Sequence, residues 1–314
     1  MPVPSLAVLN TSAAKIFSTT WCLAEVLFRQ LILRRAEVCH FIDASHAPLL
    51  IAVLLFKLRV TYLVLGEAKK DKYLSLWRLA LRSGRIKLIV ETAEVKKSWD
   101  EINRDSVFEI PVAVSSIGSD CIQEHCRQEL GIPLDAYVLL FFGTHRESKD
   151  YVTPLQGVLR FASSERPWLL FAGPVISGDD PGLLVRNSAL KEAVVINRFI
   201  PDEEAGLFFN AANLVVLSYG RNYWKGSAVL LQAVQYQKPL LVSGEGHLEN
   251  FVRNWNVGLA FESCNASSFE EAIRSFKSLP PNELSIFKQN LAFARERFSW
   301  STIIDEYMRI WEGY

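Results

Sequence analysis

A chain of 314 residues is about twice the usual domain size, so its length favours two packed α/β units, although one domain also fits. Half of the residues are hydrophobic and 34 Lys and Arg balance 34 Asp and Glu, which excludes intrinsic disorder and gives no support for nucleic-acid binding. The five cysteines show no CxxC spacing and no His ligand pattern, which predicts reduced thiols in a cytoplasmic setting and no metal cluster.

One segment near the N-terminus fits a membrane surface. In Ala24 to Arg35 (AEVLFRQLILRR), leucine, phenylalanine and isoleucine share a helical face beside three arginines. Interfacial helices have this pattern and so do ordinary surface helices, so peripheral membrane contact stays open. The most apolar stretch, 49–65, is interrupted by Lys57 and Arg59, and it therefore predicts a buried helix and a strand instead of a membrane span.

Eight short runs rich in Val, Ile, Leu and Phe alternate with helical stretches along the chain. Near-continuous apolar strands separated by helices are typical of parallel sheets covered on both faces. A polar stretch after Ile110-Pro111 places a domain boundary at 112–118, and apolar side chains at helical spacing predict a closing helix at 299–314. The eight runs are residues 38–43, 60–65, 86–92, 137–143, 167–173, 193–199, 213–219 and 239–244.

The first candidate ligand-binding segment follows the strand predicted at 137–143. Gly143 ends this strand, and Arg146 and Lys149 come next along the chain. Ligands of open α/β sheets lie beyond the carboxyl ends of the strands, and a glycine with two cations offers the close backbone approach and the charge that a diphosphate requires. A solvated basic turn is the alternative interpretation.

The second candidate segment follows the strand predicted to end near Ser218. Lys225 precedes Gly226 and Ser227, which open an apolar helix, and the free N–H groups, the serine cap and the adjacent cation together favour a bound anion. Gln232 is the polar residue of this helix. It is expected to bond a ligand ribose or, alternatively, the backbone or solvent.

Five segments of the C-terminal half match, in order, the pattern of one enzyme family. They are FFGTHRESKDYVTPLQGV, INRFIPDEEAGLFFNAANLVVLS, VLLQAVQYQKPLLVS, NVGLAFE and FSWSTIIDEYMRIW. In them the chain resembles the retaining glycosyltransferases of family 4. The resemblance implies the GT-B fold, an α/β architecture of two Rossmann-like doubly wound parallel-sheet domains facing a cleft, with a short acceptor domain at 1–112 and a nucleotide-sugar-binding domain at 113–298.

The resemblance also implies a donor site, with departures from the family pattern. The family places two Glu residues eight apart, and these positions are Trp224 and Gln232 here. The His and the Gly-rich loop of the family's first domain are not recognisable. His46 and Glu67, which follow the strands predicted at 38–43 and 60–65, are the only catalytic candidates, and a structural role is the alternative for each. The donor-binding candidates are Gly143, Arg146, Lys149, Trp224, Lys225, Gly226, Ser227 and Gln232.

The activity implied by the resemblance is transfer of a sugar, with retention, from a nucleoside-diphosphate sugar to a glycan or lipid-linked acceptor. The donor is a co-substrate, and neither a cofactor nor a metal is expected. A catalytically impaired GT-B protein that binds a nucleotide or a protein partner is the first alternative, because the Glu pair is missing. A nucleotide-sugar epimerase is the second. The expected location is the cytoplasm, with membrane association at its cytoplasmic face left open.

Overall fold

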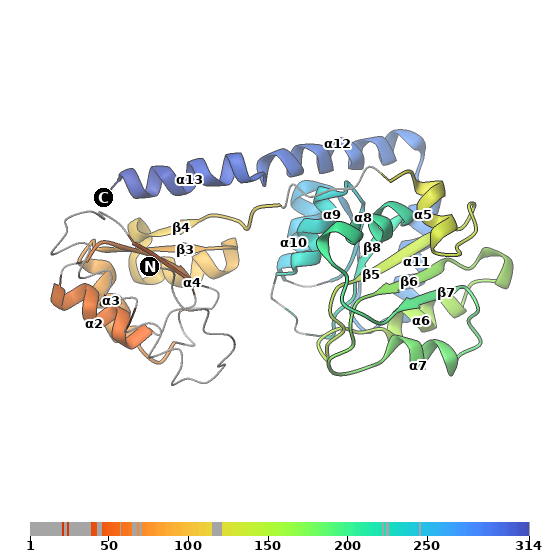
Figure 1. Cartoon of the computed structure of the whole chain (residues 1–314), viewed down its shortest axis with the longest axis horizontal. Helices are drawn as coiled ribbons and strands as arrows, with labels where there is room; N and C mark the ends of the chain where they lie inside the picture. The colour runs from red at the N-terminus through yellow and green to blue at the C-terminus, as the bar shows by residue number, and fades with distance from the viewer. Residues whose placement is uncertain are drawn as a thin grey trace. The chain divides into compact units, whose positions relative to one another are not determined.

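The computed structural model describes Trp21, Ala24 and residues 39–42, 46–56, 58–64, 68, 71–114, 121–221, 223, 226–244 and 246–313. The contacts divide the chain into two compact units, one of Met1–Val112 with Ile303–Tyr314 and one of Ala113–Thr302. Each unit contains a parallel sheet with helices packed on it (Figure 1). Apart from Ala24, the segment predicted as an amphipathic helix at 24–35 lies outside the described residues.

The first unit has a four-stranded parallel sheet in the order β1-β2-β3-β4. Parallel strands that are consecutive in the chain and adjacent in the sheet are joined by right-handed crossovers, so α2, α3 and α4 cover the same face. Trp311 Nε1 of α13 donates to Thr61 Oγ1 at 3.2 Å, on the other side of β2. The bounds are β1 Cys39–Ile42, α2 His46–Phe56, β2 Val60–Val64, α3 Leu74–Arg82, β3 Ile86–Val90, α4 Ala93–Asn103, β4 Val107–Glu109 and α13 Trp300–Glu312.

The second unit has a six-stranded parallel sheet in the order β10-β9-β8-β5-β6-β7. The strand order reverses between β5 and β8, and ligands of such sheets bind at this switch point, beyond the carboxyl ends. The strands are β5 Val138–Phe142, β6 Trp168–Ala172, β7 Ala193–Ile196, β8 Leu214–Leu217, β9 Leu240–Ser243 and β10 Gly258–Phe261. The helices are α5 Gln123–Glu129, α6 Val152–Leu159, α7 Pro181–Arg186, α8 Asp202–Ala211, α9 Ala228–Gln235, α10 His247–Trp255, α11 Ala266–Ser278 and α12 Pro281–Arg297.

β5 explains why its sequence is apolar without alternation. All five of its residues are buried, and they divide between two cores on opposite faces of the sheet. Leu140 and Phe142 pack in the core under α8 and α9, whereas Leu139 and Phe141 pack in the core under α6 and α11. A strand covered on both faces has no solvent side for polar residues, so it reads as one apolar run.

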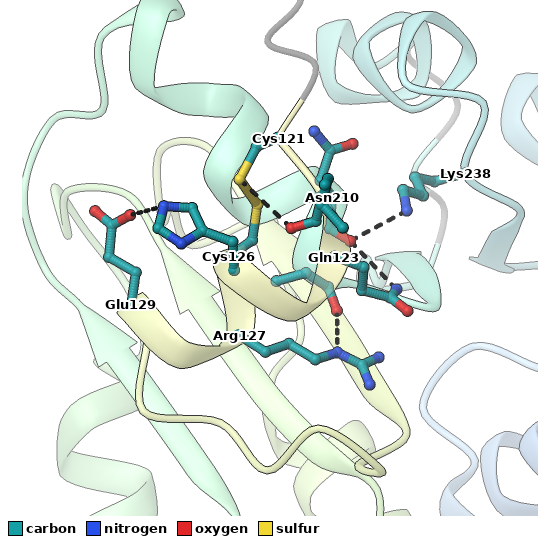
Figure 2. Close-up of a disulfide and its surroundings, with 10 residues drawn as sticks. Cys121, Gln123, Cys126, Arg127, Glu129, Asn210 and Lys238 are labelled. Atoms are coloured by element: carbon teal, nitrogen blue, oxygen red, sulfur yellow. Dashed lines mark hydrogen bonds and ion pairs between the residues drawn. A yellow bond between two sulfur atoms is a disulfide. The ribbon is translucent and has the colours of Figure 1, made fainter.

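A disulfide between Cys121 and Cys126 closes the start of α5 (Figure 2). The prediction of reduced thiols is therefore wrong for this pair, while Cys264 is a free and exposed thiol. The spacing of the two cysteines matches no motif. Packing decides whether the segment before a helix folds back onto that helix, and the spacing of two cysteines in the sequence does not reveal this.

Three donors converge on the carboxyl end of α8 beside this disulfide (Figure 2). Gln123 Nε2 and Lys238 Nζ each donate to the carbonyls of Asn210 and Ala212, and Arg127 Nε donates to the carbonyl between these two, Ala211 O, at 3.0 Å. The last carbonyls of a helix lack partners within it, so these side chains satisfy the end of α8 and attach α5 to it. Burial lowers the pKa of Lys238 to about 8, with the charges of Lys288 and Arg127 adding to the effect.

Candidate functional site

The candidate ligand-binding site of the second unit begins at the carboxyl end of β5. Gly143 follows the strand with a φ of 81°, in the region that favours glycine. A Cβ added there would lie 3.1 Å from Val229 Cγ2, in the first turn of α9, and 4.0 Å from Lys149 Nζ. Gly143 thus brings the loop after β5 and the start of α9 together, although the two segments are far apart in the sequence.

A second glycine holds the ends of β5 and β6 close together. A Cβ added to Gly173 would lie 2.2 Å from Gly143 O, a distance that no real Cβ atom tolerates. His145 N donates to Pro174 O at 2.9 Å, which ties the loop after β5 to the loop after β6. The backbone that presents the candidate cations is therefore fixed from the β6 side.

Lys149 turns back toward the end of β5. Its Nζ donates to Phe142 O at 2.8 Å. Burial lowers the pKa of Lys149 to about 8, and the neighbouring charge of the exposed Arg146 lowers it further in the same direction. An anion bound here would reverse both effects, because it would stabilise the ammonium group directly.

The loop between β8 and α9 is held by two stacked tyrosines. The rings of Tyr219 and Tyr223 lie 3.8 Å apart at an angle of 10°, and Tyr223 Oη donates to Gly226 O at 3.0 Å. Tyr219 Oη donates to Ser227 Oγ at 3.1 Å. The Ser227 side chain makes no capping hydrogen bond to α9, so the prediction of a serine cap is wrong.

Three buried polar atoms near Lys149 have no hydrogen-bond partner among the described residues. They are His145 Nε2, Asp150 Oδ2 and Ser218 Oγ. Asp150 N donates to Ser218 O at 3.1 Å, so two of the three belong to adjoining segments. Buried polar groups are nearly always paired, and a group left over commonly marks a bound water or ligand.

His145 is neutral at pH 7. It is buried, its Nδ1 shares a hydrogen bond with the hydroxyl of Tyr151, and burial followed by the charge of Lys149 lowers its pKa to about 4. A neutral imidazole beside the candidate cations adds no charge to the site. It can act as a donor or an acceptor according to its tautomer.

The remaining donor-binding candidates divide into placed and unplaced residues. Gln232 lies half-buried in α9, and no hydrogen bond of its side chain is found among the residues that the structure describes. A Cβ added to Gly226 would lie 3.7 Å from the His247 ring, which brings the first residue of α10 to this loop. Trp224 and Lys225 lie outside the described residues.

The catalytic candidates belong to the first unit, and one of them can be described. His46 Nδ1 lies 2.5 Å from Asp71 Oδ2 and His46 Nε2 lies 2.9 Å from Tyr62 Oη, so both ring nitrogens are engaged. The ring also packs edge-on against Trp77. These contacts fit a residue that holds α2 to β2. Glu67, the other catalytic candidate, lies outside the described residues.

Sequence reasoning missed three residues at this edge of the second unit, Tyr219, His145 and His247. Tyr219 is the last residue of the run predicted at 213–219, and His145 and His247 lie just beyond the runs predicted at 137–143 and 239–244. An inspection of every strand end would have found them. In the described part of the chain, no group of three or more His, Cys, Asp and Glu could hold a metal, and no helix is both long and apolar enough to cross a membrane.

Comparison with known proteins identifies the family. The family described as "Glycosyl transferases group 1" matches residues 122–291, more than half of the chain. The chain belongs to this family. The D-inositol 3-phosphate glycosyltransferase of Corynebacterium aurimucosum is 23% identical over 222 residues, which is 67% of this chain. The alignment covers 52% of that relative, so the chain spans about half the length of the curated relative it matches.

Several solved glycosyltransferase structures have the same fold as this chain. A glycosyltransferase from Rickettsia africae superposes with a TM-score of 0.74 at 12% identity, over 98% of this chain and 83% of that one. HepE of Anabaena in complex with UDP has a TM-score of 0.72 at 13% identity, over 93% and 82%. Sucrose-phosphate synthase from Thermosynechococcus elongatus has a TM-score of 0.68 at 15% identity, over 96% of this chain and 79% of that one. The α/β fold of GT-B type with two Rossmann-like parallel sheets is confirmed.

Proposed function

We propose that this group 1 glycosyltransferase binds a nucleoside-diphosphate sugar in its second unit and transfers the sugar, with retention, to a glycan or lipid-linked acceptor held by the first. The observation that carries the proposal is the position of Gly143, between Lys149 Nζ and the first turn of α9. A cation and a helix N-terminus that meet at the carboxyl edge of a parallel sheet form a site for a diphosphate.

The relatives support this choice of ligand. Structures of HepE from Anabaena contain UDP, UDP-glucose, or UDP with glucose. The proposed donor contacts are Gly143, Arg146, Lys149, Trp224, Lys225, Gly226, Ser227 and Gln232. Their cations and the start of α9 would stabilise the departing diphosphate, so the proposed reaction needs neither a metal nor another cofactor.

The acceptor side of the proposal rests on fewer residues. His46 and Glu67 stay the catalytic candidates of the first unit. The proposal also includes contact with a membrane surface and a location at the cytoplasmic face. The Cys121–Cys126 disulfide is the observation that speaks against a reducing compartment.

A thermal-shift panel of UDP-, GDP-, ADP- and TDP-sugars tests donor binding. A ligand that binds only the folded state raises the midpoint of unfolding by mass action, and one nucleotide is expected to do so more than the others. A panel without any shift in the full-length protein would refute the proposal.

A catalytically impaired member of the family is the second candidate function. The observation that favours it is the replacement of the family's two Glu residues by Trp224 and Gln232. Tryptophan accepts no hydrogen bond, and the amide of Gln232 bonds a ribose without the charge assistance of a carboxylate. Donor binding without hydrolysis or transfer, measured with a panel of acceptors, would favour this function over the enzyme.

A further inference from the structure

The outward side of α2 in the first unit is apolar. The helix, HAPLLIAVLLF, contains no Lys, Arg, Asp or Glu. Leu49, Leu50 and Val53 are buried against the sheet, whereas Leu55 is 69% exposed and Phe56 46%. A helix that is apolar on all sides is ordinarily covered on all sides. The exposed side of α2 therefore has the composition of a surface that meets an apolar partner.

The neighbouring helix α3 continues this surface and adds positive charge. Arg78, Leu79 and Arg82 have the spacing of one helix face, and all three are exposed. Leu79 is 57% exposed, and α3 contains no acidic residue. α2 and α3 pack side by side on the same face of the sheet (Figure 1). We call the exposed residues of the two helices the α2–α3 surface: Ile51, Leu55, Phe56, Arg78, Leu79 and Arg82.

Positive charge is concentrated in the segment that carries α3. Residues 57–87 contain nine Lys and Arg against two Asp and Glu. One of the two acids, Asp71, is paired with His46 and is mostly buried. The exposed Arg59 lies between α2 and β2, and Val60 N donates to Arg85 O, so the segments that follow the two helices lie side by side where β2 and β3 begin.

We propose that the α2–α3 surface docks on an anionic lipid surface. Leucine, isoleucine and phenylalanine side chains on an amphipathic surface enter the boundary between headgroups and acyl chains, and flanking arginines bind the lipid phosphates. A second copy of the chain is a poorer occupant. A twofold dimer through this surface would bring Arg78 and Arg82 of both copies into one interface, with no acidic residue of either helix to pair them. The inference deepens the membrane contact in the proposed function and is independent of donor binding.

Sedimentation of the full-length protein with lipid vesicles tests the inference. The protein is expected to bind vesicles of phosphatidylcholine with 30% phosphatidylglycerol, to bind phosphatidylcholine alone much more weakly, and to dissociate as NaCl is raised. Leu55→Ser with Leu79→Ser is expected to lower the partition coefficient at least tenfold. Arg78→Gln with Arg82→Gln is expected to lower it about fivefold for each arginine. The matched control is Leu134→Ser with Ile286→Ser, two exposed apolar residues of the second unit, which should leave it unchanged.

Three outcomes would overturn the inference. If the wild type and both double variants bind vesicles equally, the membrane contact lies elsewhere in the protein. Loss of a dimer in the variants, seen by light scattering without any vesicle binding, would assign the surface to a second copy. A large fall in thermal stability of the leucine variant without vesicle binding by the wild type would assign it to packing within the chain. Nucleotide-sugar shifts measured on the same variants keep a failure of docking distinct from a failure of the proposed function.

Discussion

Replacement of Lys149 by methionine is expected to make the free protein more stable while it weakens donor binding. The perturbation removes the charge and keeps an unbranched side chain of similar length. A pKa lowered from 10.5 to about 8 means that the folded protein carries the ammonium at a cost of about 3 kcal/mol at pH 7. Loss of the hydrogen bond to Phe142 O offsets about 1 kcal/mol of this gain, so Lys149→Met should raise the free energy of unfolding by about 2 kcal/mol.

The same pKa predicts opposite pH dependences for stability and for affinity. Between pH 8 and pH 10.5 the unfolded chain holds a proton that folded Lys149 has lost, so stability rises with pH in this window. A bound diphosphate restores the proton, so the complex holds more protons than the free protein and affinity falls in the same window. From pH 7 to pH 9.5 the dissociation constant of the wild type should rise about 30-fold, and at pH 7 Lys149→Met should lose about 1.5–3 kcal/mol of binding free energy.

Calorimetric titration of the donor and urea unfolding, each across this pH range, are the assays. Lys238→Met is the matched control, because burial also lowers the pKa of Lys238 to about 8 while its Nζ donates to the carboxyl end of α8. Lys238→Met should keep the wild-type donor affinity and its pH dependence. Because the ligand titrates equally in both variants, the difference between them reports the titration of Lys149 alone. Unchanged donor affinity in Lys149→Met, together with lower stability, would refute the reasoning.

Three further predictions concern the same unit. Gly143→Ala should lower the free energy of unfolding, measured in urea, by about 1–3 kcal/mol, because a φ of 81° is strained for alanine and the added Cβ would press on Val229. The control is Gly131→Ala, which has a φ of 68° and open space around it and should lower the free energy of unfolding less. Equal losses in the two variants would exclude a contribution from the contact with Val229. The wild type should bind the donor with measurable affinity but transfer the sugar slowly. Fast transfer that neither Trp224→Ala nor Gln232→Ala changes would show that the sugar binds elsewhere. EDTA should leave donor affinity and turnover unchanged, whereas a loss restored by a divalent cation would require a metal.

The pattern of apolar runs was enough to predict the fold class. A parallel strand buried on both faces has no polar alternation, as β5 shows, and the eight runs found in the sequence contain β1 to β3 and β5 to β9. β4 was missed among these runs because it has three residues, of which Val107 alone is buried, and so short an edge strand has no periodicity to detect. The GT-B type was predicted from the five ordered family segments, which depend on residue identity and not on periodicity.

The contacts that define the candidate site were decided by the tertiary structure alone. The sequence pointed to Gly143, Lys149 and the start of α9 separately, and the reversal of strand order between β5 and β8 is what brings them together. The lowered pKa of Lys149 depends on burial, and Ser227 Oγ accepts from Tyr219 and makes no cap, which a propensity for caps does not predict. Local sequence determines which residues form a helix or strand and where it ends. The charge state and the hydrogen-bond partners of a side chain depend on which other helix and strand ends the fold places beside it.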